Sequence, residues 1–94
     1  MAQTTVLAAA QTAAQSSDIV VSPGTTATVS LFASGKISSR VRCPIHLKGP
    51  TGSRVIGWLS GRNVSTVLSG PGTYFVTRPS ITEFGLNVGV FTEA

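Results

Sequence analysis

Few side chains of this 94-residue chain could serve acid–base or thiol chemistry near neutral pH: the carboxylates Asp18, Glu83 and Glu93, one histidine, His46, and one cysteine, Cys43. General acid–base catalysis needs two titratable groups held close together, and no two of these carboxylates are paired by their spacing. Cys43 and His46 lie three residues apart on a predicted strand, where alternation directs their side chains to opposite faces. The sequence therefore predicts no catalytic residue and a protein that is not an enzyme.

A metal site or cofactor site is supported no better by the sequence. One histidine and one cysteine on opposite faces leave too few ligands for a metal ion. The segment Gly-Pro-Gly at 70–72 lacks the following Lys-Ser/Thr and the helix of a phosphate-binding loop, so it predicts a hairpin turn. Cys43 is in register with Val41 and Ile45, which predicts a small buried apolar side chain, and a single cysteine cannot form an internal disulfide. We expect no cofactor and no metal.

A basic stripe is the one charged pattern in the chain. Arg40, Arg42, His46 and Lys48 alternate along one predicted strand, and Arg54 begins the next. Such a face could contact phosphates, but β-sheet proteins that bind nucleic acid place aromatic side chains among the charges, and simple alternation puts none on this strand face. Two interpretations remain equally favoured: a solvated face or an edge strand whose positive charge prevents unwanted strand pairing, and a patch that docks on an acidic protein surface. Binding of nucleic acid is less favoured.

The strands that position these residues follow from period-two alternation interrupted by Gly, Pro and Ser. An Ala-rich turn of helix at 11–15 is the only helical signal. Strands are expected at 4–8, 18–22, 25–33, 40–48, 54–59, 64–68, 73–78 and 84–92. Seven or eight short strands at this spacing predict an all-β fold, a small antiparallel β-sandwich or barrel of the Ig-like or jelly-roll-like kind.

Two aromatic residues refine this expectation. Tyr74 follows the turn at 70–72 and precedes the inward Val76 by two residues, which is typical of the tyrosine corner of immunoglobulin-like sandwiches. Trp58 lies on a middle strand and is expected to be the central aromatic of the core. No cysteine pair accompanies it, so the likeness to immunoglobulin domains concerns architecture alone.

Length and composition predict one domain, residues 1–94, in which 1–15 form an N-terminal arm or an edge strand. Only 11 % of the residues are charged, which favours a subunit that covers much of its surface in an assembly over a compact Thr/Ser-faced monomer. No apolar run approaches the roughly 18 residues of a membrane helix, and the N-terminus lacks the positive start of a signal peptide. We expect no membrane partner and synthesis in the cytoplasm.

Three segments together resemble small structural proteins of tailed bacteriophages. They are Met-Ala-Gln-Thr-Thr-Val-Leu-Ala-Ala at 1–9, Ser-Pro-Gly-Thr-Thr-Ala-Thr-Val-Ser-Leu-Phe at 22–32, and Leu-Ser-Gly-Pro-Gly-Thr-Tyr-Phe-Val-Thr-Arg-Pro at 68–79, continued to Gly-Val-Phe at 89–91. The strongest element is Gly-Pro-Gly-Thr-Tyr-x-Val-x-Arg-Pro at 70–79. The resemblance runs over nearly the whole chain, and its motif is structural and not chemical.

The resemblance implies a virion component, first of all a capsid decoration (cement) protein that binds the major capsid protein on the outside of the head. Such a protein is expected to be a homo-oligomer, a dimer or trimer, made in the host cytoplasm, with multivalency and strand addition strengthening its binding. The residues expected to dock are Gln3, Thr4, Thr5, Val6, Leu7, Arg40, Arg42 and Lys48. A tail, neck or fibre-associated structural module is the alternative, and a small basic nucleic-acid-binding β-barrel is the alternative of another class.

Overall fold

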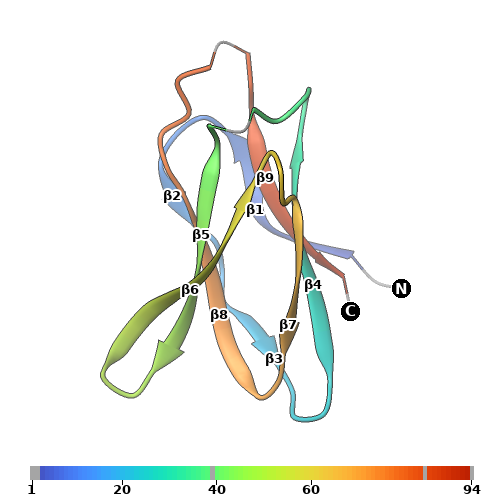
Figure 1. Cartoon of the computed structure of the whole chain (residues 1–94), viewed down its shortest axis with the longest axis vertical. Coiled ribbons are helices and arrows are strands. Elements are labelled where there is room, and N and C mark those ends of the chain that lie inside the picture. The colour runs from blue at the N-terminus through green and yellow to red at the C-terminus, as the bar shows by residue number, and fades with distance from the viewer. Residues whose placement is uncertain (1–2, 39, 84, 94) are drawn as a thin grey trace.

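The chain folds as two antiparallel sheets packed against each other in a computed structural model that describes residues 3–38, 40–83 and 85–93 (Figure 1). The first sheet has the order β1 (Gln3–Ala10), β9 (Val88–Glu93), β4 (Thr26–Ala33) and β7 (Ser65–Ser69). The second has the order β2 (Ala14–Gln15), β8 (Gly72–Arg78), β5 (Arg42–Gly49) and β6 (Gly52–Ser60), and β3 (Ile19–Val21) also pairs with β8. The prediction of a small antiparallel β-sandwich is confirmed.

The connections differ from the sequence prediction in three places. The turn at 70–72 is not a hairpin, because β7 pairs with β4 and β8 pairs with β5, so this turn crosses between the sheets. The Ala-rich segment 11–15 forms no helical turn and instead contributes β2, whose residues pair with Arg78 and Thr77. The last strand begins at Val88 and not at position 84, and Phe84 itself lies outside the described residues.

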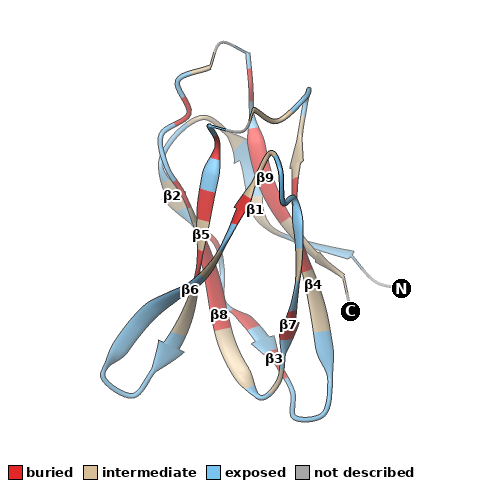
Figure 2. Ribbon diagram, viewed as in Figure 1, coloured by how far each residue is buried: buried red, intermediate tan, exposed pale blue. Residues whose placement is uncertain are grey.

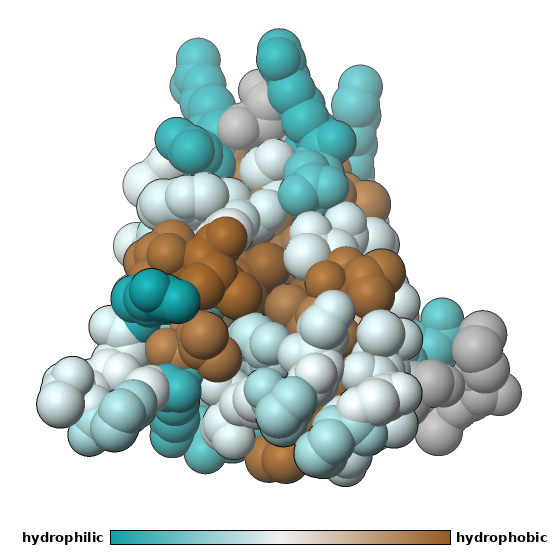
Figure 3. Space-filling model, turned by 60° about the horizontal axis from the view of Figure 1, so that its bottom comes forward, coloured by the Kyte–Doolittle hydropathy of each residue, from teal (hydrophilic) through white to brown (hydrophobic). Residues whose placement is uncertain are grey.

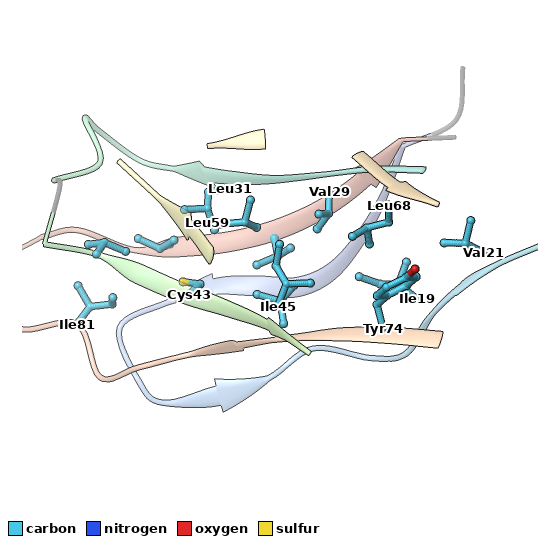
Figure 4. Close-up of a cluster of buried hydrophobic side chains, with 14 of the residues drawn as sticks. Ile19, Val21, Val29, Leu31, Cys43, Ile45, Leu59, Leu68, Tyr74 and Ile81 are labelled. Atoms are coloured by element: carbon cyan, nitrogen blue, oxygen red, sulfur yellow. The ribbon is translucent and has the colours of Figure 1, made fainter. Parts of the chain in front are cut away.

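The core lies between the sheets and is built by the alternate residues of each strand (Figure 4). On β4, Val29 and Leu31 point inward as predicted, and on β5 Cys43 and Ile45 do the same, each at most 6 % exposed. Period-two alternation produces this result because successive Cβ atoms leave opposite faces of a strand. The expected small buried residue at position 43 is confirmed.

The aromatic residue in the core is Tyr74 and not Trp58. Tyr74 is 7 % exposed, and its hydroxyl donates a 2.5 Å hydrogen bond to the carbonyl of Ser69, five residues upstream. The predicted tyrosine corner is therefore confirmed. Trp58 is 44 % exposed, so its expected core position is wrong. Its neighbours Gly57 and Leu59 point toward the core, and alternation then turns Trp58 outward.

A buried arginine joins the N-terminal segment to the rest of the sandwich. Arg78, at the end of β8, is 4 % exposed and donates hydrogen bonds of 2.7, 2.7 and 2.8 Å to the carbonyls of Thr12, Ala8 and Val88. These carbonyls belong to the end of β1, the connection to β2 and the start of β9. Residues 3–10 pair with β9 at the edge of the first sheet, whereas Ala14 and Gln15 pair with β8 in the second sheet.

Candidate partner-binding face

The outer surface of the second sheet gathers cations and aromatic rings from three strands. We name this set the cationic–aromatic face: Arg42, His46 and Lys48 of β5, Trp58 of β6 and Phe75 of β8. The register explains the gathering, because Pro44 lies opposite Trp58 and His46 lies opposite Phe75. Residues directly opposite each other in a sheet share a face, so both rings stand beside the basic stripe.

The side chains of this face contact one another closely. The guanidinium of Arg42 lies 4.6 Å from the ring centroid of Trp58, within the range of a cation–π interaction. The ring of His46 stacks on Phe75 with centroids 4.5 Å apart and planes 3° apart, and its Nε2 lies 3.1 Å from the hydroxyl of Thr77. Phe75 is therefore covered, at 7 % exposed, while Trp58 is the ring that faces solvent.

Lys48 differs from Arg42 because its charge has a partner. Its ammonium lies 2.9 Å from the carboxylate of Asp18 and 5.8 Å from the ring centroid of Phe75. Both partners of the ion pair are close to half exposed, so the pair contributes little stability. This is the one ion pair within the part of the chain that the structure describes, and Arg42 therefore presents a charge with no carboxylate in contact.

The predicted docking residues fall into two groups on different sheets. Arg42 and Lys48 share the cationic–aromatic face as predicted, and Arg40 is exposed in the turn just before β5. The other group, Gln3 to Leu7, lies on β1 at the edge of the first sheet, where it pairs with β9. The structure does not bring the two groups together into one surface, and their role in docking stays a prediction.

Sequence reasoning missed the two aromatic members of the face. Alternation along a single strand shows which way a side chain points but does not identify its lateral neighbours. For Trp58 the local signal is misleading, because counting outward from the Gly49–Gly52 hairpin places it opposite the inward Cys43, and only the register shift between Ile45 and His46 brings it opposite Pro44. For Phe75 no such local signal exists, since β8 reaches β5 through a crossing between the sheets.

Exposed apolar side chains continue from this face onto the neighbouring edge strands. Val55, Ile56 and Trp58 on β6 are each 44–46 % exposed, while Val64 just before β7 and Val67 on it are 41 % and 61 % exposed. Strands β6 and β7 are edge strands of the two sheets. Figure 3 shows hydrophobic groups gathered across the middle of the molecule, with long hydrophilic side chains projecting from one end. Exposed apolar groups beside polar ones are typical of interaction sites.

The titratable groups inside the sandwich offer no reactive centre. Burial raises the pKa of the Cys43 thiol from 9.0 to about 11, and the nearby charge of Arg78 only partly opposes this effect. At neutral pH the thiol is therefore protonated and a poor nucleophile. Among residues 3–38, 40–83 and 85–93, no group of three or more His, Cys, Asp or Glu side chains is placed to hold a metal ion. The same residues contain no helix long and apolar enough to span a membrane.

Comparisons of the chain with protein-family models, with curated proteins and with solved structures find no match.

Proposed function

We propose that this protein is a non-enzymatic virion structural protein, a capsid decoration protein of a tailed bacteriophage that docks on the major capsid protein through its cationic–aromatic face. The observation that supports docking is the exposed Arg42–Trp58 pair, whose guanidinium and ring are 4.6 Å apart. Arg and Trp are enriched among the few residues that contribute most of the binding energy of a protein interface, because they combine large contact area with directional polar groups. The assignment to a phage head rests on the sequence resemblance described above.

The charge distribution supports an acidic surface as the counterpart. All three carboxylates lie outside residues 19–82, whereas all seven Lys and Arg residues lie within them. A positive face accelerates the protein's encounter with a negative surface and orients the protein on it. On a repetitive shell, multivalency makes many weak contacts bind strongly together. A dimer or trimer on the capsid surface would increase this effect further. The protein would be made in the host cytoplasm and act on the assembled head.

The test is co-sedimentation of the purified protein with capsids that lack it, together with the melting temperature of those capsids. We expect saturable, stoichiometric binding and a higher capsid melting temperature. Trp58→Ala should weaken binding about 30-fold, the effect of losing roughly 2 kcal/mol at a central contact. Thr26→Ala is the control, because Thr26 is exposed on β4 of the other sheet and lies outside the exposed apolar groups described above. Absence of binding to heads would reject the decoration function and favour the tail, neck or fibre alternative.

Binding of nucleic acid is the second candidate, and the aromatic rings beside the basic stripe favour it. Single-stranded nucleic acid binds to sheets that combine cations with rings on which bases stack. Only Trp58 offers an accessible ring, however, because His46 covers Phe75. If the double substitution Arg40→Glu and Arg42→Glu leaves binding of an oligo(dT) probe at low salt unchanged, this candidate is rejected.

A further inference from the structure

We propose that the hairpin β5–β6 receives an extended acidic segment of a partner protein, which adds as a strand along the Gly52–Ile56 edge of β6 and places a carboxylate against Arg54. This inference deepens the proposed function, on which it rests for the identity of the partner. It concerns a different part of the surface from the Arg42–Trp58 pair.

The end of the hairpin projects from the body of the sandwich. All eight residues from Gly49 to Ile56 are exposed, and Figure 2 shows this arm as a continuous exposed ribbon that diverges from the remaining strands. It nevertheless carries large apolar side chains, since Val55 and Ile56 are nearly half exposed. A projecting hairpin that keeps large apolar side chains nearly half exposed is suited to contact another molecule.

The free edge of β6 divides into a capped part and an open part. Toward its end, Asn63 caps the strand: its side-chain amide donates to the carbonyl of Trp58 at 3.1 Å, and its carbonyl accepts from the amide of Ser60 at 3.0 Å. Along Gly52–Ile56, no loop or side chain of the described residues makes such a hydrogen bond to the strand. This segment therefore presents main-chain groups on which another strand can pair.

Arg54 supplies the charge at the open segment. Arg54 lies opposite Leu47 in the register, so its side chain projects from the face of the sheet that elsewhere covers the core. At this position the hairpin extends beyond the core, and Arg54 is exposed. There it borders a hollow of about 570 Å³ formed by residues 47–54 and Pro71. No carboxylate of the described residues pairs with it. A carboxylate from an added strand can occupy this hollow and pair with the guanidinium.

A second copy of the chain fits this edge poorly. A two-fold antiparallel pairing centred on Gly52–Ile56 would place Arg54 opposite Arg54, and like charges directly opposite each other destabilise a sheet. Ile56 also forms a bulge between the pairs Ile45–Gly57 and His46–Val55, which interrupts the edge for a long, regular partner. Both features discourage self-pairing, whereas a short acidic strand is attracted by the charge and spans only the open segment.

The experiment measures binding of a synthetic peptide that alternates Glu with Val, against two control peptides. In one control Lys replaces Glu, and in the other alternate amides are N-methylated so that one edge cannot donate hydrogen bonds. We expect only the acidic peptide to bind. Its binding should slow backbone amide hydrogen exchange in β6 but not in β1. Arg54→Glu should weaken binding at least about tenfold. Arg62→Glu, the same charge change just beyond the capped end of β6, should weaken it by less than about threefold.

Three results would overturn the inference: equal losses for Arg54→Glu and Arg62→Glu, unchanged affinity for the N-methylated peptide, or preference for an oligo(dT) probe over the acidic peptide. Thermal melts of both variants confirm that each is folded before binding is compared. The outcome is separable from that of the proposed function. Capsid binding that Arg54→Glu leaves intact would reject the inference alone, while Arg54-dependent peptide binding without capsid binding would reject the decoration function alone.

Discussion

At the scale of single residues, the fold contains one buried charge and one buried thiol that lie near each other. Arg78 has no carboxylate partner among the described residues, and its guanidinium is satisfied by three backbone carbonyls. A buried cation is costly unless hydrogen bonds replace its hydration, and here they also hold three chain segments in place. Arg78 therefore acts as a structural cross-link rather than as a binding group.

Replacing Arg78 with methionine tests this role. Arg78→Met keeps a long aliphatic side chain but leaves the carbonyls of Ala8, Thr12 and Val88 without their donor, so we expect a loss of about 3 kcal/mol in unfolding free energy. Arg62→Met, at an exposed position, should change stability by less than about 0.5 kcal/mol. Urea denaturation measures both values. Equal small losses in the two variants would contradict the structural role.

The buried thiol of Cys43 predicts a pH dependence of stability at high pH. Its pKa in the folded protein is about 11 against 9.0 for an ordinary thiol, so the unfolded chain loses the proton first as the pH rises. Stability should therefore be fully present below pH 9 and fall between pH 9 and 11, by up to roughly 2–3 kcal/mol from this group. Urea denaturation across this range should show a steeper decline for the native protein than for Cys43→Ala. Parallel declines would show that the thiol does not contribute.

At the scale of elements, two connections that cross between the sheets meet at one end of the sandwich. The amide of Gly70, between β7 and β8, donates a 3.0 Å hydrogen bond to the carbonyl of Thr25, between β3 and β4. A Cβ atom on Gly70 would overlap the backbone carbonyl of Ser22. The glycine is thus required by the close approach of two turns, not by the turn in which it stands.

Gly70→Ala is expected to destabilise the protein by about 2 kcal/mol or more, because backbone and not a flexible side chain must move aside. Gly35→Ala is the matched control: no atom lies within 4 Å of the added methyl group, and the change should stay within about 0.5 kcal/mol. Thermal unfolding followed by circular dichroism compares them. A melting temperature for Gly70→Ala as high as that of the control would show that the turns can separate at little cost.

At the scale of the whole molecule, the N-terminal strand is integrated into the sandwich. Val6 and Leu7 pack against the core, β1 covers one edge of β9, and the carbonyl of Ala8 accepts a hydrogen bond from Arg78. Removal of this strand would expose apolar surface and leave the edge of β9 unpaired. Because the total stability of a small domain is only about 5–15 kcal/mol, such a loss is a large fraction of it.

Deleting residues 1–10 should therefore abolish cooperative unfolding or lower the melting temperature by more than about 10 °C. The double substitution Thr4→Ala and Thr5→Ala, which trims exposed side chains but keeps the strand, should leave the melting temperature within a few degrees, about the effect of 0.5 kcal/mol or less. Differential scanning calorimetry distinguishes the two. A deletion that melts like the native protein would identify the segment as a separable arm.

The sequence alone predicted the features that depend on one strand at a time. Alternation placed Cys43 and Ile45 inside and Arg42 and Lys48 outside, because the direction of a side chain follows from its position in the strand. The tyrosine corner at Tyr74 was predictable for a related reason, since its hydroxyl reaches back only five residues. Two antiparallel sheets followed from the number and spacing of such strands.

Only the tertiary structure decided which strands are neighbours, and with them the candidate site. Trp58, which was expected in the core, lies on the outer face, and Phe75 lies beside the basic stripe because β8 pairs with β5. The turn at 70–72 was recognisable as a turn but not as a crossing between sheets. A local pattern records which way a side chain points, whereas lateral pairing is set by hydrogen bonds and burial shared between distant segments, which no local pattern contains.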